Sequence, residues 1–483
     1  MQSGELRESV AYSVAWSLAE KAGSMLLQLF VSILVARLLS PEDYGVMAVL
    51  TVFATLSLVV VDSGFSQMLI RGENPSASDY RTVFGFNISI SLLLYALLTL
   101  LAAPIAHFFE MPLIEEIAPV LFLLLPLNAL CVIQQAICAR NFRFDTLSKA
   151  IFLSSLISGA VAVVMALMGC GVWSLVGQRL AAMGVKALLL WWWSNWRPSG
   201  EYRLDALKRM APYSLRLMAT DIIATLYNNI SQLFVGKFYS AQMLGFYNQG
   251  QKLKDMPVAA IQQSVQSVTF PALSKIKDEE QKFSESYRQL MVMVSTFLFP
   301  VMVGLIAIAP DMFAVLLGEK WMPTVPYFEI LSLSGLFIPL SSIAYNVLKA
   351  RSDGSLIVRL EIVKRVLMTI ILVVVIPQGV VAIAWGVVAM AATEWVVNLL
   401  AAARYSSLSI LKLINSLMPQ LLGSVVMGIA VRWLLNSEPL SLFANFLLEI
   451  LLGVVIYLLW VLIFRLEAVR IALDMWNNRG KKL

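Results

Sequence analysis

The chain has 483 residues, of which 59% are hydrophobic and only 14% carry a charge. Soluble globular proteins are nearer half apolar and one quarter charged, so this composition excludes a protein folded around one aqueous core. A mean hydropathy of +0.79 indicates that a lipid bilayer is the solvent for most of the surface. The net charge of +6 is then explained by basic cytoplasmic loops, and we expect no nucleic-acid partner.

Hydrophobic runs bounded by charged residues, Gly or Pro predict an all-α integral membrane protein with about fourteen transmembrane helices. The predicted spans are 10–36, 45–70, 82–108, 117–138, 149–168, 172–195, 210–235, 253–274, 287–309, 327–348, 357–377, 380–403, 413–434 and 443–464. No connection between them is long enough to hold a second folded domain.

The distribution of basic residues predicts the orientation. With the N-terminus placed in the cytoplasm, 24 of the 36 Lys and Arg residues lie on that side. Only four lie outside, namely Arg37, Lys237, Lys320 and Arg432. Because positively charged loops stay in the cytoplasm, this ratio predicts that both termini are cytoplasmic.

The ends of the first and seventh predicted helices share a sequence pattern. Leu34-Val-Ala-Arg-Leu-Leu-Ser40 with Gly45 aligns without gaps on Phe234-Val-Gly-Lys-Phe-Tyr-Ser240 with Gly245. In a second correspondence, Pro126 interrupts the fourth helix as Pro339 interrupts the tenth. These matches indicate an internal repeat of six helices, which is a known transporter architecture.

Six is an even number, so both copies enter the membrane in the same direction and form parallel repeats. We therefore expect an N-terminal lobe at residues 1–206 and a C-terminal lobe at 207–410 around a central cavity. A final helical pair with a basic cytoplasmic tail follows at 411–483. A cavity between two such lobes can open to either face by rocking.

Polar side chains inside the predicted spans mark candidate binding surfaces, because a charge at the bilayer centre costs about 2.5 to 3.5 kcal/mol on insertion scales. The cations among them, with hydroxyl and amide neighbours, suit a substrate that carries phosphate and sugar groups. We assign substrate binding to Lys21, Gln28, Arg179, Lys186, Arg216, Asn228, Lys252 and Lys254. We expect Lys21, Arg216, Lys252 and Lys254 to converge on one cavity. The alternative is that Glu20–Lys21 and Arg216–Asp221 only neutralise charge within the bundle.

Four acidic residues are candidates for exchanging a coupling H+ or Na+ during transport: Glu20, Asp62, Asp221 and Glu394. For Asp62, which begins the sequence Asp62-Ser-Gly64, a structural turn is at least as good an explanation. Glu449 in the final pair has no assignment. We expect no other cofactor, and a single histidine with three cysteines predicts no metal site.

Several segments together resemble the Wzx-type polysaccharide transporters of the multidrug/oligosaccharidyl-lipid/polysaccharide flippase superfamily, in particular the branch related to colanic acid exporters. They are Ala36-Arg-Leu-Leu-Ser-Pro-Glu-Asp-Tyr-Gly45, Asp62-Ser-Gly-Phe65, Asn228-Asn-Ile, Val235-Gly-Lys237, Leu244-Gly-Phe-Tyr247 and Leu317-Gly-Glu-Lys-Trp321. The resemblance implies a flippase in the bacterial inner membrane for oligosaccharides linked to undecaprenyl diphosphate. It also implies that the final helical pair forms a groove for the polyprenyl tail, and it makes polysaccharide polymerase machinery a possible partner.

Two other functions compete with this interpretation. A multidrug or cation antiporter of the same superfamily would favour acidic residues in its cavity, whereas cations are at least as numerous here. A membrane-embedded polymerase or ligase needs catalytic groups in a sizeable outer loop, and the longest outer connection has about 15 residues. No Walker loop, HExxH sequence or nucleophile elbow is present, so we do not expect an enzyme.

Overall fold

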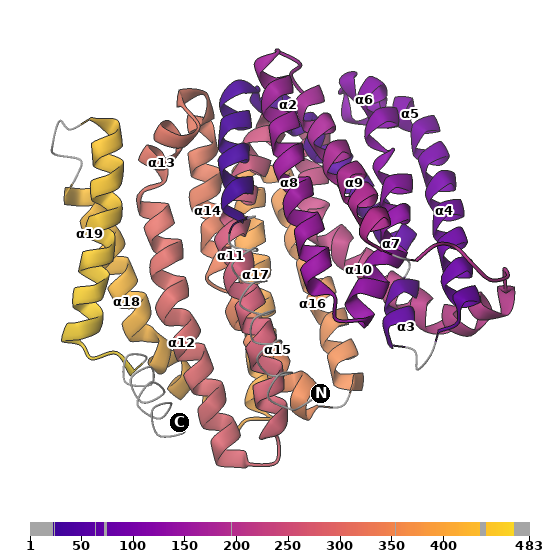
Figure 1. Cartoon of the computed structure of the whole chain (residues 1–483). Helices are drawn as coiled ribbons and strands as arrows, with labels where there is room; N and C mark the ends of the chain where they lie inside the picture. The colour runs from indigo at the N-terminus through magenta and orange to yellow at the C-terminus, as the bar shows by residue number, and fades with distance from the viewer. Residues whose placement is uncertain are drawn as a thin grey trace. The chain divides into compact units, whose positions relative to one another are not determined.

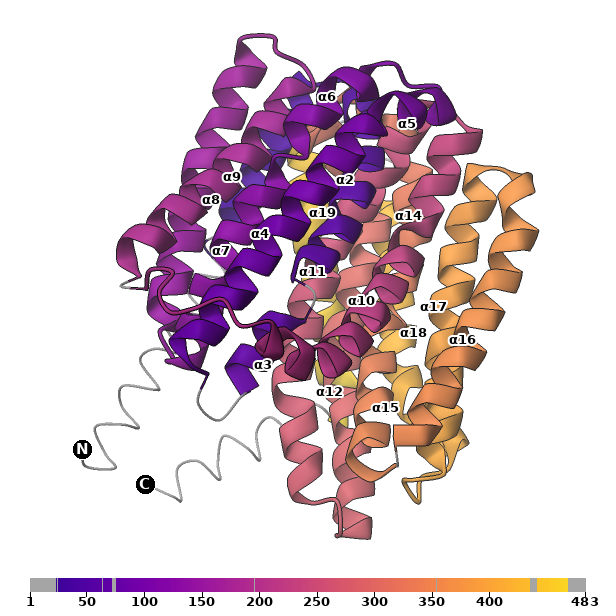
Figure 2. The same ribbon diagram turned by 90° about the vertical axis from the view of Figure 1, so that its right-hand side faces the viewer.

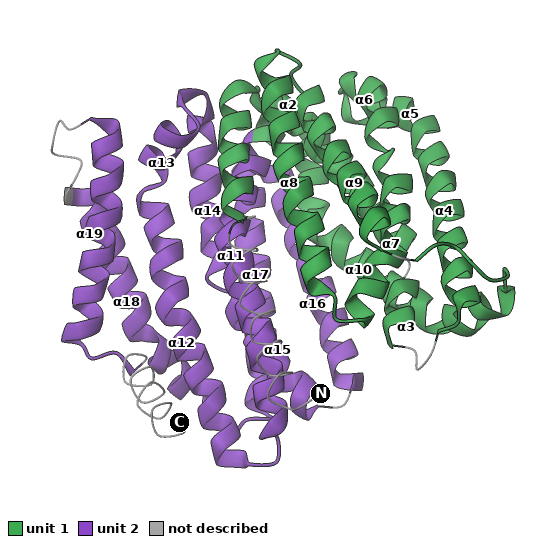
Figure 3. Ribbon diagram, viewed as in Figure 1, with its two compact units in different colours: residues 1–245 green, residues 246–483 purple. Residues whose placement is uncertain are grey.

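The computed structural model describes residues 23, 25–62, 64–71, 75–194, 196–352, 354–434 and 441–467. All regular structure in these residues is helical, which confirms the predicted fold class (Figure 1). The chain divides into two compact units, residues 1–245 and 246–483 (Figure 3). The lobe boundary expected at 206 and 207 concerns the sequence repeat and stays a prediction.

The first unit contains a helix at Met25–Leu38 and nine further helices, with the start of a tenth. They are α2 (Pro41–Asp62), α3 (Phe65–Arg71), α4 (Ala77–Leu100), α5 (Ala102–Phe109), α6 (Leu113–Leu121), α7 (Leu124–Arg140), α8 (Phe144–Leu167), α9 (Trp173–Trp193), α10 (Leu204–Phe238) and the start of α11 (Ala241–Lys275). Within this unit α8 packs along α9, α7 packs on α4 and α9, and α10 packs on α2.

The second unit contains the rest of α11 and the helices that follow it. They are α12 (Glu280–Ala307), α13 (Ala309–Leu316), η1 (Glu319–Thr324), α14 (Val325–Gly335), α15 (Ile338–Arg351), α16 (Gly354–Val375), η2 (Ile376–Gln378), α17 (Val380–Ala403), α18 (Ile410–Leu434) and α19 (Leu442–Ile463). Here α12 packs on α18, and α17 packs on α14, α15 and α16. Figure 2 shows α16 and α17 side by side.

Nine helical stretches in the described ranges are long and apolar enough to cross a membrane. Helices α9, α10, α11 and α16 have at least 21 residues each but are not among the nine. Three of these helices, α9, α10 and α11, carry six of the ten charged candidates. The total of fourteen spans therefore stays a prediction.

Both helix interruptions expected at proline occur. A proline ring clashes with the carbonyl four residues earlier, so a helix tends to end there. The position four residues before Pro126 is Phe122, which follows the last residue of α6. The position four residues before Pro339 is Gly335, the last residue of α14.

The predicted spans 45–70 and 82–108 are both wrong in their continuity, and the second is divided at Leu101 between α4 and α5. The segment 45–70 is expected as a single helix, but α2 ends at Asp62 and α3 begins at Phe65. Between them Gly64 has a φ of +67°, a left-handed conformation that glycine adopts without a side-chain clash. The helix breaks here because the backbone turns, and this supports the turn interpretation of the Asp62 segment.

The sequence repeat has a structural counterpart inside the first unit. Ser40 and Ser240 precede α2 and α11, and each hydroxyl accepts a hydrogen bond of 3.2 Å from the backbone N–H three residues later. Such a side chain caps the helix start by pairing a free N–H group. The two aligned serines therefore perform the same role.

The aligned glycines lie where the starts of these two helices touch. A Cβ atom added at Gly45 would overlap the carbonyl oxygen of Ala241, and one at Gly245 would overlap that of Pro41. The Gly245 position would also be 3.2 Å from the Gly45 nitrogen. The contacts are reciprocal at the same offset of 200 residues as the sequence match.

We expect Gly245→Ala to destabilise the protein by about 1–3 kcal/mol, the usual cost of forcing extra atoms into a packed contact. The clash is with backbone, which cannot rotate away as a side chain can. The measurement is the thermal denaturation midpoint of the detergent-solubilised protein. Gly184→Ala is the matched control, because a Cβ there meets nothing within 4 Å. Equal midpoints for the two variants would contradict the close helix contact.

Candidate functional site

A polar pocket of about 430 Å³ lies in the first unit between α2, α3, α7, α8 and α10. Two of the predicted ion-coupling residues, Asp62 from α2 and Asp221 from α10, line it together. Ser66 at the start of α3 donates a 2.5 Å hydrogen bond to Asp62 Oδ1. The two carboxylates are close enough for the charge of Asp221 to act on Asp62.

Amide side chains add to the polar lining of this pocket. Gln67 on α3 and both Asn128 and Gln135 on α7 reach it. The break between α2 and α3 places residues from both helices around the same opening. Carboxylate and amide oxygens both bind hard cations, and a carboxylate also binds a proton. The structure therefore brings together two acids that the sequence places 159 residues apart.

The other two acidic candidates have different environments. Glu20 lies outside the described residues. Glu394 on α17 forms an ion pair with Lys364 on α16, with Nζ 3.6 Å from Oε1. The same ammonium lies 2.5 Å from Glu361, and the Lys364 side chain is only 2% exposed. Glu394 thus already has an internal counter-cation.

Two predicted substrate-binding cations lie on α9 of the first unit. Arg179 and Lys186 are seven residues apart, on one helix face, and both are half-buried. In the part of the chain that the structure describes, neither side chain has a hydrogen-bond or ion-pair partner. An unpaired cation in a membrane protein is costly, so these two are strong candidates for an anionic ligand.

The candidates on α10 are more accessible. Arg216 and Asn228 are exposed, and the Arg216 side chain forms no ion pair with any described residue. No ion pair joins Arg216 to Asp221 in these residues, and the choice between substrate binding and charge neutralisation stays a prediction. Gln28, on the helix Met25–Leu38, donates a 3.5 Å hydrogen bond to Ser155 of α8.

The remaining cations are divided between the second unit and the undescribed N-terminus. Lys252 on α11 is exposed, whereas Lys254 is buried and forms an ion pair of 2.6 Å with Asp255. Lys21 lies outside the described residues. The convergence of Lys21, Arg216, Lys252 and Lys254 on one cavity stays a prediction.

An apolar groove of about 650 Å³ lies in the second unit between α12, α18 and α19. Its lining includes Phe297, Pro300 and Leu305 from α12, with Met427 from α18 and Leu458 from α19. The family resemblance implies a groove formed by the final helical pair, whereas α12 as one of the walls was not predicted. The part of α12 that lines the groove is almost entirely apolar, with Thr296 as its one polar lining residue. This apolar face of α12 is the sequence feature that could have predicted the wall.

Side-chain hydrogen bonds hold α19 against its neighbours. Tyr457 Oη donates to the Thr296 carbonyl of α12, and Trp460 Nε1 donates to the Pro419 carbonyl of α18, each over 3.0 Å. Two of these residues, Thr296 and Tyr457, also line the groove. The spacing of the groove walls is therefore set by polar contacts as well as by apolar packing.

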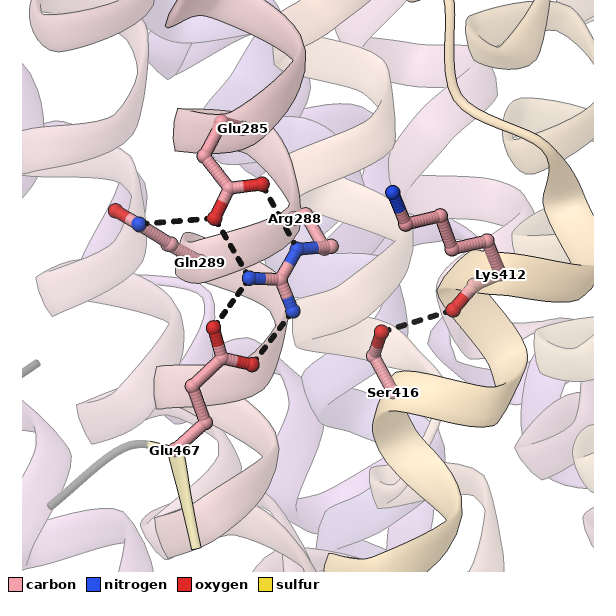
Figure 4. A network of polar contacts seen from close by, with 6 residues as sticks. All are labelled: Glu285, Arg288, Gln289, Lys412, Ser416 and Glu467. Carbon is pink, nitrogen blue, oxygen red and sulfur yellow. Dashed lines mark hydrogen bonds and ion pairs between the residues drawn. The ribbon is translucent and has the colours of Figure 1, made fainter. Parts of the chain in front are cut away.

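A buried arginine fastens the segment after α19 to α12. Arg288 lies between Glu285 and Glu467 and bonds to both carboxylates, while Gln289 donates to Glu285 (Figure 4). The Nη1 to Glu467 Oε2 distance is 2.6 Å. On the neighbouring α18, the Ser416 hydroxyl bonds to the Lys412 carbonyl (Figure 4). Because charge-assisted bidentate bonds are strong and directional, Arg288 fixes where this chain end lies.

Curated relatives with sequence similarity to this chain are polysaccharide biosynthesis and transport proteins. The chain is 26% identical to the teichuronic acid biosynthesis protein TuaB of Bacillus subtilis, over 63% of each chain. It is 25% identical to the succinoglycan biosynthesis transport protein ExoT of Rhizobium meliloti, over 98% of this chain and 96% of that one. It is 23% identical to the lipopolysaccharide biosynthesis protein WzxC of Escherichia coli, over 72% of each.

Solved structures support the fold. The lipid II flippase MurJ in an inward closed conformation matches with a TM-score of 0.75 and 15% identity, over 94% of this chain and all of that one. An inward-facing multidrug resistance transporter of the MATE family matches with a TM-score of 0.55, over 80% of this chain and 95% of that one.

A family model described as polysaccharide biosynthesis protein matches residues 34–326, which is more than half of the chain. This match agrees with the names of the relatives and with the fold, and it confirms the resemblance to Wzx-type transporters. The chain belongs to this polysaccharide biosynthesis protein family.

Proposed function

We propose that the protein is a flippase that moves undecaprenyl-diphosphate-linked oligosaccharide repeat units across the bacterial inner membrane, for surface polysaccharide synthesis. The substrate enters from the cytoplasmic leaflet and leaves in the periplasmic leaflet as the protein alternates between two openings. The chain acts as a transporter, with no chemical step, and both termini face the cytoplasm. The translocated unit is then available to polysaccharide polymerase machinery.

The observation that carries this proposal is a set of cations on α9 and α10 without an anionic partner among the described residues. Arg179, Lys186 and Arg216 have this property, whereas Lys254 and Lys364 are paired with acids. A diphosphate offers the negative charge and the acceptor oxygens that arginine and lysine recognise. A cation exporter would gain nothing from such residues.

The apolar groove supplies the second requirement of an amphiphilic substrate. A polyprenyl chain has no hydrogen-bonding group, so it needs a surface that is itself apolar. The groove between α12, α18 and α19 has this chemistry, and its volume of about 650 Å³ can hold part of such a chain. We therefore assign the head group to the cationic helices and part of the tail to the groove.

The pocket at Asp62 and Asp221 is our candidate for a coupling ion, H+ or Na+. Two neighbouring carboxylates repel each other when both are ionised, and a shared proton or a small cation relieves that repulsion. Glu394 is a weaker candidate because Lys364 already balances its charge. We propose that ion binding at the pocket drives the cycle.

We expect Lys21→Ala and Arg216→Ala to reduce export of surface polysaccharide by about ten- to hundredfold. This range corresponds to the loss of one hydrogen bond to a charged group, about 1.5–3 kcal/mol. The measurement is cell-surface polysaccharide in a strain that depends on this protein, with membrane insertion checked by immunoblot. Lys149→Ala removes a charge from an exposed side chain and is the matched control.

Normal surface polysaccharide in both variants would reject the cationic site. Loss of drug resistance with unchanged polysaccharide would instead favour the antiporter. Accumulation of a lipid-linked unit on the cytoplasmic side is the expected result for a failed flippase, whereas a polymerase defect would leave single units exposed outside.

We expect Asp62→Asn and Asp221→Asn to abolish the response of flipping to an imposed H+ or Na+ gradient. Downhill equilibration of a fluorescent polyprenyl-diphosphate glycolipid in proteoliposomes should remain, because the cations and the groove are intact. Asp145→Asn, a change at an exposed side chain, is the control. If both Asn variants respond like the unmodified protein, this pocket does not couple transport. If the unmodified protein ignores every gradient, transport is uncoupled.

A further inference from the structure

Glu449 is a buried acid to which the proposed transport cycle assigns no role. It lies on α19, lines the apolar groove and is only 8% exposed. Its Oε2 atom is buried and has no hydrogen-bond partner among the described residues. One turn earlier on the same helix, Asn445 Oδ1 is also buried and unpaired. An unpaired carboxyl group aimed into a groove is unusual enough to require an explanation.

The groups that face Glu449 do not neutralise it. The lining residues of α12 include no charged side chain. From α18, the positive charge of Arg432 acts on Glu449, but Arg432 already forms a 2.9 Å ion pair with Glu329. From α13, the negative charge of Asp311 acts in the opposite direction. Tyr457, on α19 itself, donates its hydroxyl proton to the Thr296 carbonyl.

The state of the carboxyl group therefore depends on what fills the groove. Hydrocarbon surrounds the carboxyl with a medium that cannot solvate a carboxylate, so the protonated acid is favoured. Water in an empty groove solvates the carboxylate and favours release of the proton. The groove's volume of about 650 Å³ is large enough to admit either.

We propose that Glu449 is a proton-binding site whose protonation is linked to occupancy of the groove by a polyprenyl chain. The proton comes from water when the chain enters and returns to water when the chain leaves. This inference rests on the proposed function, since that function supplies the chain. Linkage is reciprocal, so proton binding at Glu449 strengthens retention of the chain by the same factor.

The test uses the full-length protein in nanodiscs and infrared difference spectroscopy of the protonated carboxyl carbonyl band across a pH series. The probe is undecaprenyl phosphate. We expect a titrating band that is absent from Glu449→Gln. We expect its midpoint to rise by at least about one pH unit with the probe, which is a tenfold linkage. Glu319→Gln removes an exposed acid elsewhere and should leave the band unchanged.

A second variant separates occupancy of the groove from effects of the lipid head group. Gly453 lines the groove, and a Cβ added there would have its nearest neighbour, Val431 Cγ2, at 3.6 Å, an ordinary van der Waals contact. We expect Gly453→Leu to fill part of the groove and raise the midpoint without the probe. Such a rise would come from apolar filling alone.

Two results would overturn the inference: a band that persists in Glu449→Gln, or a midpoint that neither the probe nor Gly453→Leu moves. Glycolipid flipping measured on the same preparation separates this inference from the proposed function. Normal flipping with an unmoved midpoint rejects only the linkage. Absent flipping with a midpoint that the probe moves rejects the flippase and retains the proton site.

Discussion

The cost of placing an ionised group in a low-dielectric environment governs the arrangement of this protein. A charge on a membrane helix must have a partner, reach water or receive a ligand. Lys364 lies between Glu361 and Glu394, and Arg288 lies between Glu285 and Glu467. These charges are satisfied inside one unit and hold its helices together. The unpaired cations on α9 stand apart from them because nothing described in the protein serves as their counter-ion.

The cost of burying a charge is also consistent with the separation of acidic, cationic and apolar residues into three different regions. Acids without a basic partner line the polar pocket at Asp62 and Asp221. Cations without an acidic partner lie on α9 and α10, and the groove on α19 is apolar apart from Glu449, Thr296 and Tyr457. A charged head group matches the chemistry of the cations, and a long apolar tail matches that of the groove.

The sequence predicts the backbone of this fold better than its polar contacts. The span at 380–403 coincides with α17, because Gly379 and Arg404 bound a predominantly apolar run. The breaks near Pro126 and Pro339 follow from proline chemistry. Helices α10 and α11 each have 35 residues and extend well beyond the predicted spans, because their ends are polar. Hydropathy marks where a helix is apolar, and a helix can continue into water.

Polar contacts between helices could not be predicted in the same way. Lys364 and Glu394 are 30 residues apart, and only the antiparallel packing of α16 on α17 brings them together. The sequence identified Asp62 and Asp221 as acids in or near membrane spans, but their shared pocket depends on the turn at Gly64. Glu449 is the clearest example of a residue whose environment could not be predicted from the sequence. Its burial on α19 is visible only once α12 is known to form the opposite wall.

The electrical and chemical parts of an ion gradient act on different parts of the proposed cycle. Moving one charge across 100 mV changes its energy by about 2.3 kcal/mol, and an interior-negative potential favours outward movement of an anionic diphosphate. It also favours the inward return of unoccupied cations. The membrane potential can therefore assist both halves of the cycle without a bound ion. A pH gradient has no such effect on the phosphate charge itself and needs a group that gains and loses a proton. This is the role that we propose for the carboxyls of Asp62, Asp221 and Glu449.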